Sequence, residues 1–228
     1  MEKQLSIGLI SEGVTDHAII ENILTGFFNN NDLDIRALQP TRDYARGAQT
    51  SHANWIKVFD WCKSERMAEA LNFIDYIVIQ IDTDVSAEKG FDVPKIIDGK
   101  ARDASAMVLA TQQKLQWVMG AIFDKYKDKI IFAIAVESIE CWVLPLLYST
   151  KPHQQATVNC LQRVNQVLIK DGFTIDTKAK NYNNIYDKIS KDYQKQKLLK
   201  QFYPSNPSLK IFVENLKSTF TNNQFFKN

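Results

Sequence analysis

The sequence predicts an α/β protein in which a parallel sheet is flanked by helices. Apolar segments of strand length alternate with longer segments whose apolar residues recur at helical spacing. Parallel strands need a helix-sized connection between them, and the alternation supplies one. After residue 150 the sequence is helical in pattern and rich in Lys and Asn. We therefore expect an α/β domain over residues 1–150 and a helical extension packed on it over residues 151–228.

The first predicted strand is an apolar segment, residues 5–10, that stops at a polar Ser-Glu-Gly turn. A helix should follow at once, because Thr15 or Asp16 can cap it and apolar residues recur at helical spacing after them. The polar run at residues 29–32 should end this helix.

A second short apolar segment, residues 35–38, predicts another strand, and residues 55–71 suggest one further helix. The clearest strand is residues 76–81, which are apolar except for one Gln and lead directly into Asp-Thr-Asp. Residues 85–103 contain Gly, Pro and several Lys, and they are typical of a long, functional loop.

The helical pattern resumes over residues 105–126, and residues 130–136 form the fourth predicted buried strand. An amphipathic helix over residues 139–147 should follow it. The order of elements therefore predicts four parallel strands whose carboxyl ends meet at one edge of the sheet, where ligands bind in folds of this class.

Composition excludes several classes of protein. The formal net charge is +2, so composition alone makes no strong case for a nucleic-acid or membrane partner. The three Cys are odd in number and lack metal-ligand spacing, which favours a reducing compartment over a disulfide framework. No apolar run is long enough for a signal peptide or a membrane span. We expect a cytoplasmic protein without a membrane partner.

Three of the predicted strands end in acidic residues. Glu12 follows the first strand, Asp82 and Asp84 follow the third, and Glu137 follows the fourth, with Glu140 one helical turn later. Clustered carboxylates repel one another unless a cation neutralises them, and Mg²⁺ prefers oxygen ligands. An Asp-x-Asp pair also points both carboxylates to one side. This pattern predicts a divalent-metal site.

These residues also resemble a known family. The segments SEGVTDH after the first strand and IDTD after the third resemble the Toprim domain of primases, topoisomerases and OLD-family nucleases. The resemblance covers about residues 5–148 by element order and implies a Toprim-like, Rossmann-like sheet. It also implies that Glu12, Asp82 and Asp84 bind Mg²⁺ or Mn²⁺ and serve nucleotidyl transfer or phosphodiester cleavage.

The segment AVESIECWVLP is similar to a small stand-alone group of Toprim-like bacterial proteins suspected of roles in phage defence. Glu137, Glu140 and Trp142 carry this similarity, and an Arg-Gly segment with Arg42 and Arg46 adds to it. A catalytic Tyr context, a zinc motif and an accessory primase region are not evident. The resemblance therefore implies hydrolysis, with Glu137 as a further catalytic residue and a protein partner from a defence system.

Cations near this edge are candidates for binding phosphate. Arg42 and Arg46 lie in a loop that should face the metal, and Arg binds phosphate through two hydrogen bonds. Lys178 and Lys180 could reach back to the acidic residues and stabilise charge in the transition state. The loop lysines are further candidates, namely Lys89, Lys95 and Lys100.

Structural explanations exist for each of these residues. Asp16, a further candidate site residue, suits a helix cap, and a Glu in the first turn of a helix is favoured by the helix dipole alone. Lysines on loops or on an amphipathic helix can simply be solvated. Under these alternatives the acidic residues after the strands form caps and solvated loops.

The sequence thus predicts a metal-dependent phosphodiesterase or nuclease that acts on nucleic acid. Asp82 and Asp84 would hold the metal, and Glu12 would be a general base or a second ligand. Two rival functions stay open. One is a non-catalytic module that binds metal or nucleic acid beside a partner protein. The other is a small-molecule phosphotransfer enzyme, although no GxxxxGK[ST] loop is present.

Overall fold

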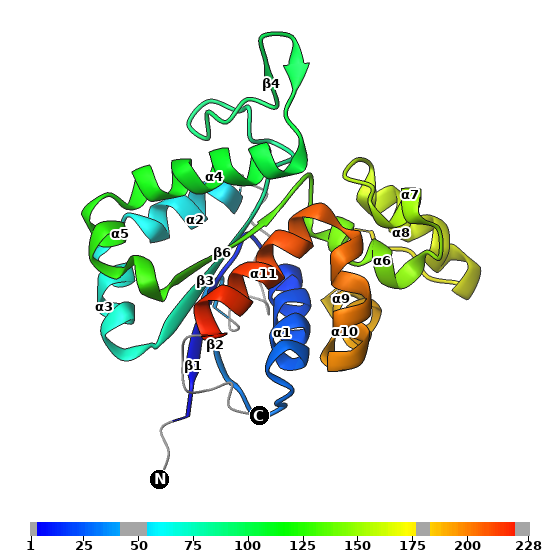
Figure 1. Cartoon of the computed structure of the whole chain (residues 1–228), viewed down its shortest axis with the longest axis horizontal. Coiled ribbons are helices and arrows are strands. Elements are labelled where there is room, and N and C mark those ends of the chain that lie inside the picture. The colour runs from blue at the N-terminus through cyan, green and yellow to red at the C-terminus, as the bar shows by residue number, and fades with distance from the viewer. Residues whose placement is uncertain (1–3, 42–53, 177–182, 222–228) are drawn as a thin grey trace.

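A computed structural model describes residues 4–41, 54–176 and 183–221 of the chain (Figure 1). Its centre is a parallel four-stranded sheet with the strand order β2-β1-β3-β6. The α/β class with helices flanking a parallel sheet is confirmed, and it is compatible with a Rossmann-like fold. Each of the four predicted strands of this sheet is present. They are β1 (Ser6–Ile10), β2 (Asp34–Gln39), β3 (Tyr76–Asp82) and β6 (Ile130–Ala135).

Both faces of the sheet are covered by helices, and two apolar clusters fill the space between them (Figure 1). Successive side chains of a strand point to opposite faces, so Val78 joins one cluster while Ile77 and Ile79 join the other. Helix α1 (Val14–Phe28) covers the first face. The second face is covered by α2 (Asn54–Cys62), α3 (Glu65–Phe73), α4 (Ala104–Met119) and α5 (Ala121–Tyr126).

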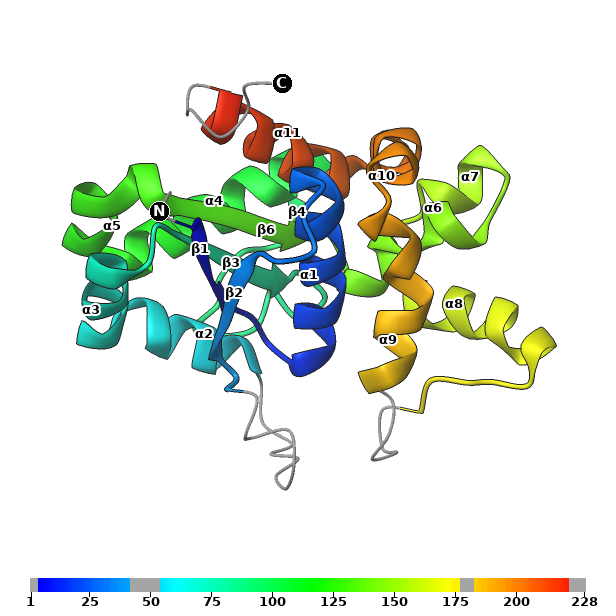
Figure 2. The same cartoon turned by 90° about the horizontal axis from the view of Figure 1, so that it is seen from below.

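The chain after residue 150 continues as helices that pack on the sheet domain (Figure 2). Helices α9 (Asn183–Ser190) and α10 (Gln196–Phe202) contact α1, and α11 (Pro207–Thr221) contacts β6 and α4. Gly26 permits this packing, because a Cβ there would lie 1.8 Å from the backbone oxygen of Tyr193. The remaining helical elements here are α7 (Lys151–Gln154), α8 (Cys160–Leu168), η4 (Ile169–Asp171), η5 (Lys191–Gln194) and η6 (Tyr203–Ser205).

Three helix predictions are corrected by the structure. The single helix expected over residues 55–71 is two, because Ser64 turns the chain and caps α3. The helix expected over residues 105–126 is also two, since Gly120 takes a positive φ of 51° between α4 and α5. The segment after Glu137 is not one amphipathic helix. It consists of a short 3-10 helix, η3 (Ile139–Trp142), followed by α6 (Leu144–Leu147). A further 3-10 helix, η2 (Lys127–Lys129), lies just before β6.

The long loop after β3 contains an unpredicted β-hairpin, which we call the arm. Its strands are β4 (Ile96–Ile97) and β5 (Lys100–Ala101), and Figure 1 shows it projecting from the rest of the molecule. Asp98 and Gly99 form its turn with φ values of 50° and 75°, as a two-residue type I′ hairpin turn requires. Ile96, the first residue of β4, is 60% exposed.

No helix in the described part of the chain combines the length and apolar character that crossing a membrane requires. The cytoplasmic location stays a prediction.

Candidate functional site

The acidic residues after β1 and β3 lie side by side at the carboxyl edge of the sheet. Glu12 is the second residue after β1. Asp82 is the last residue of β3, the strand beside β1 in the sheet. The Glu12 carboxylate accepts a hydrogen bond from the backbone N–H of Asp82 at 2.8 Å. The Gln80 amide donates to the Asp82 carboxylate at 2.7 Å. The one polar residue inside β3 therefore orients the acid at its end.

Asp16 lies in the first turn of α1 and is almost fully buried. Gly13, rather than Thr15 or Asp16, is the N-cap of this helix. The Asp16 carboxylate instead accepts the N–H of Gly13 at 2.7 Å, so it satisfies the free backbone donor from the third helical position. Capping explains its orientation but does not explain the cost of burying a charge beside Glu12 and Asp82.

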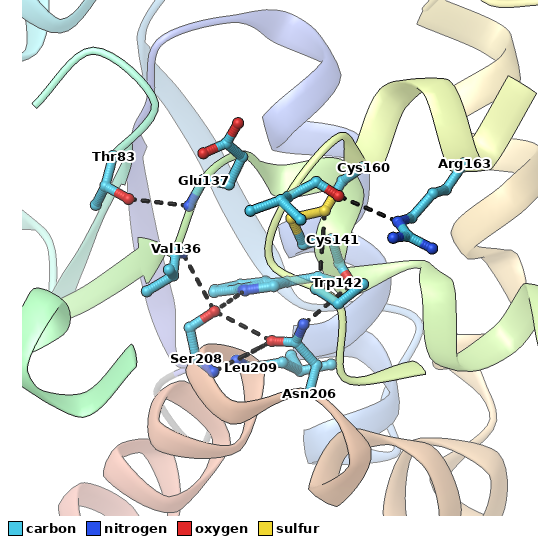
Figure 3. Close-up of a disulfide and its surroundings, with 12 residues drawn as sticks. Thr83, Val136, Glu137, Cys141, Trp142, Cys160, Arg163, Asn206, Ser208 and Leu209 are labelled. Atoms are coloured by element: carbon cyan, nitrogen blue, oxygen red, sulfur yellow. Dashed lines mark hydrogen bonds between the residues drawn. A yellow bond between two sulfur atoms is a disulfide. The ribbon is translucent and has the colours of Figure 1, made fainter. Parts of the chain in front are cut away.

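Glu137 is joined to the end of β3 through Thr83, which is buried between the two aspartates. The Thr83 hydroxyl accepts the N–H of Glu137 at 2.9 Å, and the N–H of Thr83 donates to the carbonyl of Glu137 at 3.0 Å (Figure 3). Glu137 has a positive φ of 68°, which is uncommon for a residue other than Gly. Thr83 holds both backbone groups of Glu137 in this conformation.

The pKa values of these carboxyl groups are raised by burial and, to a smaller extent, by one another's charges. Burial is the main cause, and it raises the pKa of Glu12 to about 8 and that of Asp16 to about 7. Burial followed by the charges of Glu12 and Asp16 holds the pKa of Asp82 well above its usual range. Burial and the charge of Glu137 also raise the pKa of Asp84. These carboxyl groups therefore interact as one cluster that holds protons more tightly than isolated carboxyls do.

A pocket of about 630 Å³ opens beside this cluster. Asp82, Asp84, Glu137 and Glu140 line its acidic side. Glu12 and Asp16 are not lining residues but are close enough to Asp82 for their charges to raise its pKa. Helix α8 supplies the other side of the pocket, through residues 159–162 and Asn165. The structure thus brings together the candidate residues from three strand ends and places a neutral helical wall opposite them.

Several residues of the site were missed from the sequence. The Tyr186 hydroxyl, on α9, donates a hydrogen bond to the Glu140 carboxylate, and burial and that charge raise the pKa of Tyr186. The Ser208 hydroxyl accepts hydrogen bonds from the indole of Trp142 at 2.8 Å and from the N–H of Val136 at 3.3 Å (Figure 3). No local sequence signal marks Tyr186 or Ser208, because their partners lie 46 to 72 residues away.

The predicted phosphate-binding residues Arg42, Arg46, Lys178 and Lys180 lie outside the described residues. Of the loop lysines, Lys95 forms an ion pair with Glu137, with 3.3 Å between Nζ and Oε2. Lys89 and Lys100 are exposed. The base of the arm therefore contacts the rim of the acidic pocket.

The donor chemistry of the cluster suits a hard divalent cation, because every candidate ligand is a carboxylate oxygen. Among the described residues, no group of three or more His, Cys, Asp or Glu side chains is arranged to hold a metal ion. Mg²⁺ commonly takes only one or two protein carboxylates and completes its shell with water and substrate phosphate. Asp82, the last residue of β3, and Asp84, two residues later, both line the pocket and are the candidates for this smaller set of ligands.

The cysteine pattern favoured a reducing compartment over a disulfide framework, yet two of the three cysteines are bonded. Cys141 and Cys160 form a disulfide, whereas Cys62 is a buried free thiol (Figure 3). The number and spacing of the cysteines did not indicate this pair, because the bond depends on how α8 packs against η3.

Comparison of the chain with models of protein families, with curated proteins and with solved structures finds no match. The geometry of the site is therefore the basis for inferring its function.

Proposed function

We propose that this protein is a divalent-metal-dependent phosphodiesterase that hydrolyses nucleic acid, with a Toprim-like site and a role in defence against phage. The observation that carries the proposal is the convergence of Glu12, Asp82 and Asp84 at one sheet edge beside a pocket. Burying mutually repelling carboxylates lowers stability, so their grouping favours a bound cation.

Asp82 and Asp84 would hold the ion, since both line the pocket. When bound, Mg²⁺ or Mn²⁺ supplies Lewis-acid chemistry that activates water and offsets phosphate charge. Glu12 would serve as a general base or as a second ligand, because its carboxylate contacts the backbone of Asp82 at the same sheet edge. Glu137 would orient Lys95 at the rim of the pocket.

The arm supports a polymeric substrate. It extends from the loop that follows Asp84, and it carries exposed Lys100 together with exposed Ile96 and Ile97. Cations beside apolar side chains suit a nucleic acid, in which phosphates and base faces are both accessible. We infer that the arm contacts the strand flanking the cleaved phosphate.

The helices after residue 150 would form an extension that completes the site. α8 forms the wall opposite the carboxylates, and Tyr186 on α9 holds Glu140. Residues on both sides of position 150 line the pocket, so neither part of the chain would form it alone. The extension and the sheet domain would therefore act together.

The test is cleavage of labelled single-stranded and double-stranded DNA and RNA with Mg²⁺ or Mn²⁺, comparing the wild type with Asp82→Asn. We expect the variant to lose activity by on the order of 100-fold or more, because it removes the charge of a ligand while keeping its shape. Asp128→Asn is the matched control. Asp128 is exposed and precedes β6, at the opposite end of the strand from the site.

Equal activity of Asp82→Asn and the wild type would reject the site. If the wild type cleaves none of these substrates, with or without metal, the proposal of a nuclease fails. Metal binding that Asp82→Asn abolishes would then point to a non-catalytic module or to a phosphotransfer enzyme with a small substrate.

A further inference from the structure

The disulfide joins the two sides of the acidic pocket. Cys141 follows Glu140 in η3, on the acidic side, and Cys160 is the first residue of α8, on the opposite side. Glu140 and Cys160 both line the pocket. The bond therefore links the neighbour of a candidate site residue, Glu140, to the first residue of α8 (Figure 3).

Besides the disulfide, the first turn of α8 is held by Leu161, which packs partly buried against the apolar cluster, and most other contacts of the helix lie further along it. Val164 and Leu168 are buried in the apolar cluster, and the Tyr148 hydroxyl donates to the carbonyl of Arg163 at 2.9 Å. The first turn itself starts at Asn159, which has a positive φ of 55° and whose side chain makes no capping hydrogen bond. The disulfide therefore adds a covalent link to the partial packing of Leu161 at this turn.

The acidic side is held independently of the bond. The Asn206 amide donates to the carbonyl of Cys141 at 3.2 Å, and the Tyr193 hydroxyl donates to the carbonyl of Trp142 at 2.5 Å. Breaking the disulfide should consequently leave η3 in place and free only the first turn of α8.

We propose that the Cys141–Cys160 disulfide is a redox switch of the pocket, closed when it fixes the first turn of α8 and opened by a dithiol reductant. Of the two bonded cysteines, Cys160 is the one that lines the pocket, and it is 2% exposed while Cys141 is fully buried, so one thiolate of the reductant attacks the Cys160 sulfur. Cys141 then leaves as a thiolate that takes up a proton. The second thiol of the reductant then displaces Cys160 and becomes part of the reductant's disulfide. Two electrons and two protons pass to the protein.

Reduction would lower the affinity for substrate, since the neutral wall no longer holds substrate against the carboxylates. This regulatory consequence rests on the function proposed above, whereas the loosening of α8 does not. Cys62 takes no part, because it is a free thiol in the apolar cluster on the other face of the sheet, away from the pocket.

The first experiment is hydrogen–deuterium exchange of metal-free protein in its oxidised state, in its reduced state and as Cys160→Ser. We expect exchange in residues 156–163 to rise about tenfold or more on reduction, and in Cys160→Ser without reduction, while exchange in β3 stays unchanged. Cys62→Ala is the matched control and should respond to reduction like the wild type.

Counting thiols in unfolded protein that was never reduced should give one reactive thiol, that of Cys62. Three reactive thiols, or equal exchange in α8 before and after reduction, would overturn the proposal whatever the protein's activity.

The second experiment measures KM for the cleaved nucleic acid under both conditions. We expect KM of the wild type to rise about tenfold on reduction, and KM of Cys160→Ser to be high and insensitive to the reductant. A loosened α8 with an unchanged KM would overturn the regulatory part alone. If no nucleic acid is cleaved, the failure is that of the proposed function, and the exchange experiment still decides the structural part.

Discussion

Thr83 shows how one buried residue sets the geometry of the acidic site. It lies between Asp82 and Asp84, and its backbone N–H also donates to the carbonyl of Ala135 at 3.1 Å. Through Glu137 it links the end of β3 to the end of β6. A pattern of acids alone would place these side chains near one edge, whereas Thr83 determines which way Glu137 faces.

Replacing Thr83 by Val should test this link at the scale of one residue. The change keeps the shape of the side chain but leaves the N–H of Glu137 without its acceptor. We expect the free energy of unfolding to fall by about 1–3 kcal/mol, measured by urea denaturation. Thr83→Ser, which keeps the hydroxyl, is the control and should lose less. A larger loss in Thr83→Ser than in Thr83→Val would show that packing of the methyl group matters more than the hydrogen bond.

At the scale of elements, α11 holds the segment that carries Glu137 and Glu140. Asn206, just before the helix, accepts the N–H groups of Ser208 and Leu209, each at 3.1 Å. The Ser208 hydroxyl then accepts from Trp142, whose ring stacks on Phe212 of the same helix. A helix near the end of the chain thus fixes the turn after β6.

Ser208→Ala removes only one hydroxyl group, yet we expect it to destabilise the protein strongly. It leaves two buried donors unsatisfied, the indole N–H of Trp142 and the backbone N–H of Val136. We expect a loss of about 2–4 kcal/mol in the free energy of unfolding, measured by urea denaturation. Ser218→Ala, an exposed change in the same helix, should cost less than about 0.5 kcal/mol. Similar losses in the two variants would contradict this role of α11.

For the whole molecule, the carboxylate cluster predicts an unusual dependence of stability on pH. The folded-state pKa values of Glu12 and Asp16, about 8 and about 7, exceed their ordinary values of 4.5 and 3.8. The folded protein therefore binds more protons than the unfolded chain between these limits. The contribution of these two groups to stability is complete below about pH 4, and it is lost progressively as the pH rises to about 7 to 8.

We expect the melting temperature of metal-free protein to fall between about pH 6 and about pH 8.5, as measured by calorimetry at constant ionic strength. Asp82→Asn should flatten this fall, because it removes one of the repelling charges. Mn²⁺ should raise the melting temperature most at the alkaline end, where the carboxylates are ionised and a cation binds only the folded state. A melting temperature that rises steadily over the same range would contradict the assigned pKa shifts.

Much of the sheet could be predicted from the sequence, because it follows from local patterns. The four strands, the acids after them and the helix after β1 each depend on residues close together in the chain. The helix boundaries were predicted less well, because the local signals that end a helix are weaker than the apolar pattern that indicates one. Ser64 and Gly120 break helices whose apolar periodicity continues across them, and periodicity alone does not register such breaks.

By itself, then, the sequence determined that this is an α/β protein with Glu12, Asp82, Asp84 and Glu137 at strand ends, since the spacing of apolar residues specifies strands and helices directly. Only the tertiary structure decided what surrounds these acids: the wall formed by α8, the bond between Cys141 and Cys160, and the contacts of Tyr186 and Ser208. The physical reason is that these contacts join residues far apart in the chain, so they arise from how whole elements pack.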